Sequence, residues 1–516
     1  MRFKLGLLFI FCSNSVFGFE SPDSLGTGFG SFTSISGGPQ TSDMVLAESF
    51  AFQYIAATGE SYDPGKTFKA KFDFTGFVPT NSDRDGVLSI NHELAPGGVT
   101  MMNMVFNSST KRWARSNVSE VDFTPQIGTI ANCSGAVTPW NTIITCEETV
   151  VNTDVNSDGY TDTGWAIEID PLTREMVDHQ KLWALGNFKH ENAVVHGNRR
   201  TVYQGADAPV GYLFRFVADA AEDLSAGKLY AYKGSKSGSG QWVLLQNSTP
   251  NERNTVNSQC NALGATVFNG IEDVEISPID SMIYFAVKGE NTVYRFTDTD
   301  PIIGTTIPVF ETYVGGTGVS YNLTTSSEIV SEPWGTGCDN LAFDNEGNLF
   351  VLQDGFHLGS TDHNHLWMVG KTHSQANPDV RIFLKSPIGS EPTGITFTPD
   401  FKFMFLSFQH PSSSNSSSYL PDVSGRKTDF SKDVAIVIAR NEEWGVVNCD
   451  TLSQSISALS GEYLFYNSKS LMAEAEIPSS HYVEFHAGES IELSPGFTSN
   501  SGSTFMAIPD GCQNLN

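Results

Sequence analysis

A strand–turn–strand unit that opens on polar or acidic residues recurs along this chain, and this recurrence constrains the fold more than any other feature. Clear copies are Lys189–Asp207, Gly270–Ala286, Gly337–Gly355 and Gly389–Pro411. Strands expected at 86–93 and 138–148 end on acidic residues and bring the number of units to six. Repeated β units with a spacing of about 50 to 80 residues are typical of a β-propeller.

Length and composition favour an all-β protein. A chain of 516 residues is too long for one ordinary hydrophobic core unless it is built from repeats. Glycine (47 residues) and phenylalanine (36) are abundant, charged residues make up 17%, and few windows show helical periodicity. We predict a six-bladed β-propeller over residues 45–445 and a small β module over 446–516, where alternating residues and glycine turns continue.

The N-terminus has the three regions of a secretory signal peptide. Arg2 and Lys4 precede an apolar run from Leu5 to Cys12, and small and polar residues lead to Gly18. We predict a signal peptide over 1–18, a Gly/Ser-rich leader over 19–44, and secretion or display at a bacterial cell surface. No later segment of the sequence is apolar for long enough to span a membrane.

The negative charge of the chain limits its partners. The formal net charge is −28, and removal of Arg2 and Lys4 with the signal peptide makes it −30. Such a surface argues against non-specific binding of nucleic acid. It also provides many carboxylates for divalent cations.

Acidic residues that open the inner strands of a propeller gather at one mouth of its central channel. The residues expected there are Glu93, Glu148, Glu191, Glu272, Asp339 and Glu391. Like charges at short separations cannot all remain ionised without compensation. Bound multivalent cations are the compensation that we expect.

The segment Asn132–Glu148 ends with Cys146 and two adjacent glutamates, Glu147 and Glu148. Because strand side chains alternate between faces, at least one of these acids points inward. An inward carboxylate requires a cation or a hydrogen-bond network. The alternative for this segment is a disulfide between Cys133 and Cys146 across a hairpin, with the glutamates solvated.

A second metal-binding pattern follows at Asp154, Asn156, Asp158 and Asp162. These oxygen ligands occupy positions 1, 3, 5 and 9 of a loop with Gly159 at position 6, as in an EF-hand calcium loop. Position 12 is Trp165 instead of glutamate, so a further ligand would have to come from elsewhere. The alternative is a solvated turn rich in Asp and Asn.

Several segments resemble, in order and in combination, the PhoX family of secreted alkaline phosphatases. The matching segments are Asn91–Glu93, Asn132–Glu148, Phe188–Glu191, Ile271–Asp273, Asp339–Gly355 and Pro387–Pro411. The resemblance implies a six-bladed propeller and a secreted metal-dependent phosphatase that acts on small phosphomonoesters. It also implies a cluster of Fe(III) and Ca2+ ions at the channel mouth, bridged in part by the thiolate of Cys133.

The resemblance also implies the residues of the site. The metal ligands would be Glu93, Cys133, Glu148, Glu191, Glu272, Asp339, Asp354 and Glu391, and Cys133, Glu191 and Glu272 would lie at the catalytic centre. Hard cations favour carboxylate oxygens, and a field of cations favours the thiolate form of cysteine.

The sequence departs from the family pattern at two positions. Where the family has an arginine that grips phosphate, two residues before the glutamate of the fourth unit, this chain has Gly270. The glycine after the Pro-Trp pair is replaced by Asn141. The basic residues that could replace the missing guanidinium are Lys189, Arg199, Arg200 and Arg215.

Two other functions are compatible with a six-bladed propeller. One is a calcium-dependent lactonase or esterase, which has no use for Cys133 as a ligand. The other is a binding propeller displayed at the cell surface with purely structural calcium, because a fold does not determine a function. The C-terminal module resembles small β modules of secreted bacterial proteins, which implies a role in export or surface attachment.

Overall fold

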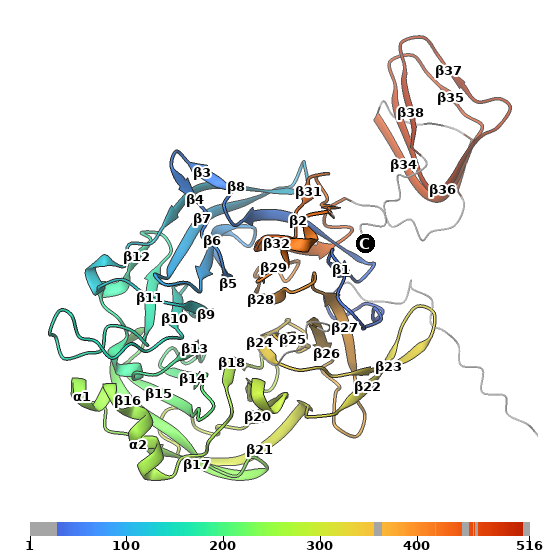
Figure 1. The fold of residues 1–516 in the computed structure, drawn as a ribbon. Helices are drawn as coiled ribbons and strands as arrows, with labels where there is room; N and C mark the ends of the chain where they lie inside the picture. The colour runs from blue at the N-terminus through green and yellow to red at the C-terminus, as the bar shows by residue number, and fades with distance from the viewer. Residues whose placement is uncertain are drawn as a thin grey trace, which may run out of the picture.

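The computed structural model describes residues 28–355, 364–417, 419–445, 454–457, 459 and 463–508, and these residues form an all-β fold. Small sheets are arranged around a common centre, as in a propeller (Figure 1). The predicted signal peptide lies outside the described residues. No helix in the described part of the chain is long and apolar enough to cross a membrane.

Four of the sheets around the centre are separate and antiparallel. The first contains β5 (Phe72–Ser82), β6 (Asp85–His92), β7 (Gly98–Asn107) and β8 (Arg112–Glu120). The second contains β9 (Asn132–Val137), β10 (Ile143–Glu147), β11 (Ala166–Asp170) and β12 (Glu175–Met176). The third contains β24 (Cys338–Phe343), β25 (Leu349–Gln353), β26 (His365–Val369), β27 (Val380–Lys385) and β1 (Val45–Leu46). The fourth contains β28 (Glu391–Phe397), β29 (Phe403–Gln409), β32 (Val434–Arg440) and β2 (Phe50–Ala57).

The remaining part of the ring is one nine-stranded sheet. One half contains β13 (His190–Val195), β14 (Thr201–Ala206), β15 (Leu213–Ala220), β16 (Asp223–Gly234) and β17 (Gly238–Leu244). The other half contains β18 (Ile271–Ile276), β19 (Ile283–Val287), β20 (Thr292–Phe296) and β21 (Thr306–Gly315). Because β17 pairs with β21, two units that the sequence predicts as separate blades are continuous here. The propeller-like arrangement is therefore confirmed, with four separate sheets and one joined sheet.

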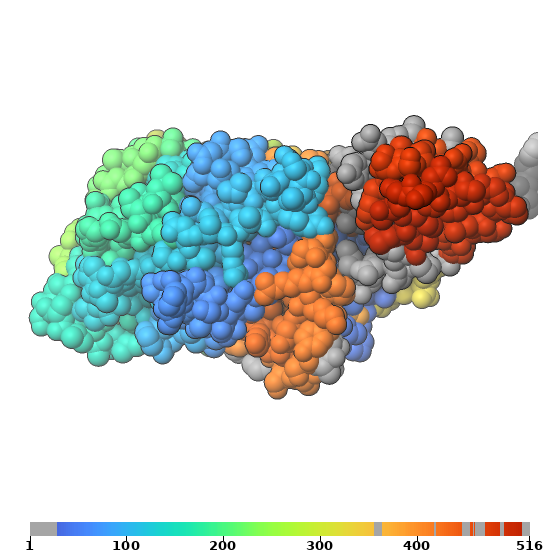
Figure 2. Space-filling model, turned by 90° about the horizontal axis from the view of Figure 1, so that it is seen from above, coloured from blue at the N-terminus to red at the C-terminus, as the bar shows by residue number. Residues whose placement is uncertain are grey.

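The ring is closed by pairing between a strand near the N-terminus and the last strand of the ring in sequence. Strand β2, near the N-terminus, pairs antiparallel with β32. The pairs run from Phe50↔Arg440 to Ala57↔Val434, with a shift of register between Tyr54 and Ala56. In the space-filling view of Figure 2, the orange segment that includes β32 accordingly lies against the blue segment of the N-terminal strands. Closure by non-neighbouring segments means that the outermost unit is not left with an open edge.

Apolar side chains fill the space between neighbouring sheets. Phe77 of the first sheet stacks on Phe405 of the fourth, with ring centroids 5.0 Å apart, and Trp113 packs edge-on against both. Residues before β1 join the core as well: Phe29 and Phe32 are buried against Phe50 and Phe383. Two short helices, α1 (Pro250–Asn254) and α2 (Val256–Leu263), lie between β17 and β18.

The C-terminal residues pair differently from the rest of the chain. Strands β33 (Gln454–Ile456), β34 (Tyr463–Ala473), β36 (Tyr482–Leu493) and β38 (Thr504–Ile508) form a parallel sheet. A second parallel pair is formed by β35 (Glu476–Ile477) and β37 (Thr498–Ser499). Leu471, Val483 and Phe485 belong to a small apolar cluster of this segment. Parallel strands joined by short turns indicate successive coils of chain that stack on one another.

Candidate metal centre at the channel mouth

The first strand of each unit lines the centre of the ring. Neighbouring inner strands pack against one another in the order β5, β9, β13, β18, β24, β28 and back to β5. Residues at or next to the start of these strands line one cavity of about 500 Å³: Asp73, Cys133, Glu191, Glu272, Asp339 and Glu391. Since side chains alternate along a strand, the same position in each strand faces the same cavity.

A second set of residues reaches this cavity from the neighbouring strands. Each lies directly after the second strand of its unit, that is, after β6, β10, β14, β19 or β25: Glu93, Glu148, Asp207, Lys288 and Asp354. Glu93 and Glu148 were predicted to open inner strands, which is wrong, because they follow β6 and β10. The inner strands of those two units instead contribute Asp73 and Cys133. All eight metal ligands expected from the sequence nevertheless line the cavity.

Several of these ligand atoms are within reach of a shared ion. Three groups have atoms that all lie within 4.8 Å of one another: Asp73, Glu93 and Cys133; Cys133, Glu148 and Glu191; and Glu191, Glu272 and Asp339. The Sγ atom of Cys133 lies 3.5 Å from Asp73 Oδ2 and 3.4 Å from Glu191 Oε1. Cys133 and Glu191 each belong to two groups, so they connect the three groups into a row.

Unpartnered oxygen atoms support the same interpretation. Asp73 Oδ1 and Gln409 Oε1 are buried and accept no hydrogen bond in the structure; Glu272 Oε1 also accepts none, although it lies 3.7 Å from Lys288 Nζ. An unsatisfied buried acceptor costs about 1–3 kcal/mol, and more when it is charged. Oxygen atoms of this kind suit a hard cation such as Ca2+ or Fe(III), so the donor set fits a metal cluster.

The electrostatics of the cavity favour a bound cation. Burial raises the pKa of the carboxyls of Asp73, Glu191 and Glu272 well above the ordinary value, and neighbouring carboxylates raise it further. Burial and the nearby Asp207 raise the pKa of Glu148 to about 8. The thiol of Cys133 is shifted upward for the same reasons, burial first and then the acids around it, so its pKa is also raised. Burial and repulsion between neighbouring carboxylates therefore disfavour the charged forms of these residues, and a bound cation would offset that penalty.

The two adjacent glutamates have different roles. Glu148 lines the cavity, whereas Glu147 is fully buried and both of its carboxylate oxygens accept hydrogen bonds from Lys181 Nζ, at 2.8 and 2.9 Å. Thr129 and the backbone N–H of Trp165 also donate to Glu147. Of the two inward-pointing acids, one is held by a buried lysine and one is available to a metal ion.

Cys133 and Cys146 do not form a disulfide. Both are free thiols. Cys133 faces the cavity, while Cys146 is fully buried in an apolar cluster with Ile144 and Ala166. Cys133 therefore lies among the candidate metal ligands of the cavity, and Cys146 lies in the core.

In the described part of the chain, the basic residues that line the cavity are Lys189 and Lys288. Of the four candidates from the sequence, only Lys189 is among them. Arg215 is fully buried and bound to Asp298, Arg199 pairs with Glu222, and Arg200 donates to a backbone carbonyl. Lys288 was missed because its position becomes recognisable only once the second strands of the units are aligned.

Gly270 lies beside Lys288 in this cavity. Its backbone has a φ of +78°, which L side chains rarely adopt, and a Cβ atom there would lie 2.9 Å from Asp207 Oδ1. The backbone of this chain thus leaves little room for a side chain at the position where the family pattern has arginine.

The predicted calcium loop does not line the cavity. Asp154, Asn156 and Asp158 are exposed and Asp162 is half-buried, and Asp154 accepts hydrogen bonds from the backbone N–H groups of Asp158 and Gly159. Asp158 accepts from Tyr160, and Asp162 accepts from Val155. Bonds of this kind occur both in calcium loops and in turns rich in Asp, so the calcium site there stays a prediction.

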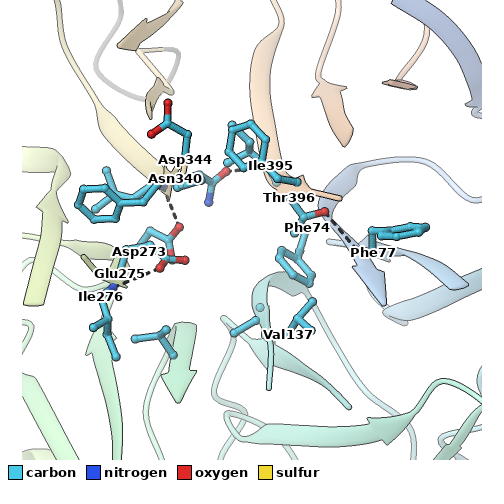
Figure 3. Close-up of a pocket in the computed structure, with 18 of the residues that line it drawn as sticks. Phe74, Phe77, Val137, Asp273, Glu275, Ile276, Asn340, Asp344, Ile395 and Thr396 are labelled. Carbon is cyan, nitrogen blue, oxygen red and sulfur yellow. Dashed lines mark hydrogen bonds between the residues drawn. The ribbon is translucent and has the colours of Figure 1, made fainter. Parts of the chain in front are cut away.

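A second cavity of about 410 Å³ lies farther along the same inner strands (Figure 3). Phe74, Phe77 and Ile395 line it, together with Asp273 and Asn340. Asp273 accepts a hydrogen bond from the backbone N–H of Leu341, and Asn340 Oδ1 accepts one from Gly394. These bonds join β18 to β24 and β24 to β28, so they hold the inner strands in place beneath the acidic cavity.

A comparison with protein families finds a match to the model described as alkaline phosphatase PhoX, over residues 99–412. Among solved structures, PhoX from Pseudomonas fluorescens in complex with vanadate, a transition state analogue, matches with a TM-score of 0.62 and 20% sequence identity. That match covers 80% of this chain and 98% of the other. At this identity it shows that the fold is shared.

More distant matches include two gluconolactonases. The one from Xanthomonas campestris has a TM-score of 0.38 and 10% identity, covering 79% of this chain and 98% of that one. The periplasmic one from Pseudomonas aeruginosa has a TM-score of 0.36 and 10% identity, covering 80% and 94%. Neither is similar enough to support an argument about function. No curated protein sequence matches the chain.

Proposed function

This chain belongs to the alkaline phosphatase PhoX family, and we propose from that premise that it is a secreted metal-dependent phosphomonoesterase. The observation that carries the proposal is the row of three ligand groups at the channel mouth, with a cysteine thiol between two carboxylates. A calcium-dependent lactonase would need no thiol in this position, and a binding propeller would need no buried acceptors without partners. The arrangement therefore favours the phosphatase over both alternatives.

The proposed metals are Fe(III) and Ca2+. Cys133 and the acids grouped with it, Asp73, Glu93, Glu148 and Glu191, would hold iron, because a thiolate with several carboxylates suits that ion. The remaining carboxylates would hold calcium. When bound, such ions polarise the phosphoryl oxygens and neutralise charge that develops during displacement.

The side chains of the cavity have two tasks in this proposal. The carboxylates hold and orient the cations. The side chain of Lys189 is 46% exposed at the cavity, and its ammonium would bind the phosphate dianion of a small phosphomonoester. A lysine binds as a point charge and lacks the paired donors of a guanidinium, so we expect substrate binding to be weaker than an arginine at residue 270 would allow.

The rest of the chain is assigned in the same proposal. The nine-stranded sheet would consist of two blades joined at their outer strands, which gives six blades; the six inner strands that pack in a ring support this count. Residues 1–18 would direct export, and residues 446–516 would form a module for export or surface attachment. The loop Asp154–Asp162 would bind one structural Ca2+.

The experiment is hydrolysis of p-nitrophenyl phosphate by the purified mature protein, as isolated, after metal removal, and after addition of Fe(III) and Ca2+. A lactone substrate serves as the matched control for the rival chemistry. We expect phosphatase activity that is lost with the metals, returns with them and is inhibited by vanadate. Lactone hydrolysis without phosphate-ester hydrolysis, or no hydrolysis by protein that contains its metals, would contradict the proposal.

A further inference from the structure

Lys288 differs in charge from the residues that line the cavity at the equivalent position, directly after the second strand, in other units. In four units this position holds a carboxylate, Glu93, Glu148, Asp207 or Asp354, and in one it holds Lys288. The Lys288 side chain is only 16% exposed. Burying an ammonium costs free energy unless carboxylates surround it, so the groups in contact with Lys288 Nζ indicate its role.

The ammonium of Lys288 binds several carboxylates at once. Its Nζ atom lies 2.6 Å from Asp354 Oδ2, 2.8 Å from Asp339 Oδ2 and 3.7 Å from Glu272 Oε1. These acids come from two consecutive units, so one positive charge holds together side chains from both. The backbone N–H of Lys288 donates to the carbonyl of Gly270, which anchors the residue at the end of β19. A metal ion at this point would have the same oxygen neighbours.

The predicted ligand groups reach the side of the cavity that Lys288 occupies only through Glu272 and Asp339. The row of groups runs from Asp73 through Cys133 and Glu191 to Asp339. In the described part of the chain, no such group includes Asp354, the acid nearest to the ammonium. The ligand groups and Lys288 therefore share Glu272 and Asp339, whereas Asp354 pairs with the ammonium and belongs to no ligand group among the described residues.

We propose that Lys288 is a built-in cation of this centre, which occupies a position that a divalent metal ion would take if the residue were neutral. This inference rests on the proposed function, because it requires the rest of the mouth to bind metals. It assigns to this chain one metal ion fewer than its ring of carboxylates could hold. It also makes Lys288 a positioning residue that holds Glu272, Asp339 and Asp354 before any metal binds.

The test compares Lys288→Met with wild type and with Lys189→Met. The control removes an ammonium from the same cavity, but Lys189 contacts one carboxylate, Glu148, at 3.3 Å. After dialysis against Ca2+ and removal of free ions, elemental analysis gives calcium per chain. We expect about one more calcium ion per chain in Lys288→Met and no gain in Lys189→Met, because only the former exposes several uncompensated carboxylates. The melting temperature of Lys288→Met should also depend more steeply on Ca2+ than that of wild type.

Equal calcium content in Lys288→Met and wild type would overturn the inference. If Lys288→Met folds only when Ca2+ is present, that result supports it, because calcium then replaces the missing ammonium. If the variant does not fold at all, anomalous diffraction from the metal-loaded wild-type protein decides. An ion bound to both Asp339 and Asp354 would overturn the inference, and an ammonium between them would support it.

These outcomes are separate from those of the proposed function. Absence of metal or phosphatase activity from the wild-type protein would refute the proposed function. The difference in calcium content between Lys288→Met and wild type tests the role of Lys288.

Discussion

Removal of the Lys181 ammonium tests whether the two adjacent glutamates of β10 have been assigned correctly. Lys181 and Glu147 are both fully buried, and two hydrogen bonds of 2.8 and 2.9 Å join them. Removing one partner of a buried ion pair costs about 3–5 kcal/mol, because the other charge stays buried without compensation. Lys181→Met should therefore lower the free energy of unfolding by about 3–5 kcal/mol.

The neighbouring carboxylate should respond in the opposite way. Glu148 lines the cavity, where burial and the nearby Asp207 disfavour its charge. Glu148→Gln removes this repulsion, so the metal-free protein should be as stable as wild type or more stable. The variant should, however, lose metal, whereas folded Lys181→Met should keep the metal content of wild type.

Urea unfolding of the metal-free proteins, followed by tryptophan fluorescence, measures the stabilities, and elemental analysis measures the metals. The exposed Lys228→Met on β16 is the control, with an expected change within about 0.5 kcal/mol. The assignment would be refuted if Lys181→Met cost less than about 1 kcal/mol, well below the cost of a broken buried pair. It would also be refuted if Lys181→Met lost the metal and Glu148→Gln kept it.

Three further predictions concern the cavity and the loop. Cys133→Ser should lose iron and any charge-transfer colour while the fold remains, whereas Cys146→Ser should keep the iron and the colour. Elemental analysis and absorption measure this. Iron in both variants would contradict the role of Cys133. In the metal-free protein the folded-state pKa of Glu148 is raised to about 8, so the stability of the fold should be highest at acidic pH and fall as the pH rises towards 8. Melting curves in chelator should show this fall, and added Ca2+ should make the fall smaller. A melting temperature that does not change with pH would contradict this prediction. Asp158→Asn should weaken Ca2+ binding at the loop without changing the iron content, and titration calorimetry that finds unchanged calcium binding would leave the turn interpretation.

The acidic mouth could be predicted from the sequence because its signal is local. Glu191, Glu272, Asp339 and Glu391 each stand at the start of an apolar strand, and the structure places all four in one cavity. Strand alternation is sufficient to infer which face such residues occupy. Alternation also predicted that at least one of Glu147 and Glu148 points inward and needs a cation or a hydrogen-bond network, although the sequence did not reveal that Lys181 binds Glu147.

Other parts of the site depend on register and could not be read from the sequence. Asp73 was missed because the first unit was taken to begin at residues 86–93, which form the second strand of that sheet. Asp207 and Lys288 follow second strands, and only alignment of the units in space shows that these positions are equivalent. The joining of two units through β17 and β21 depends on pairing between strand edges, which leaves no periodic signal in the sequence.

The central claim is that the channel mouth holds a cluster of iron and calcium ions. Elemental analysis of the purified mature protein, after removal of loosely bound ions, tests this most directly. We expect iron together with a larger amount of calcium in each chain, and loss of the iron in Cys133→Ser. Protein that carries calcium but no iron, with or without Cys133, would contradict it.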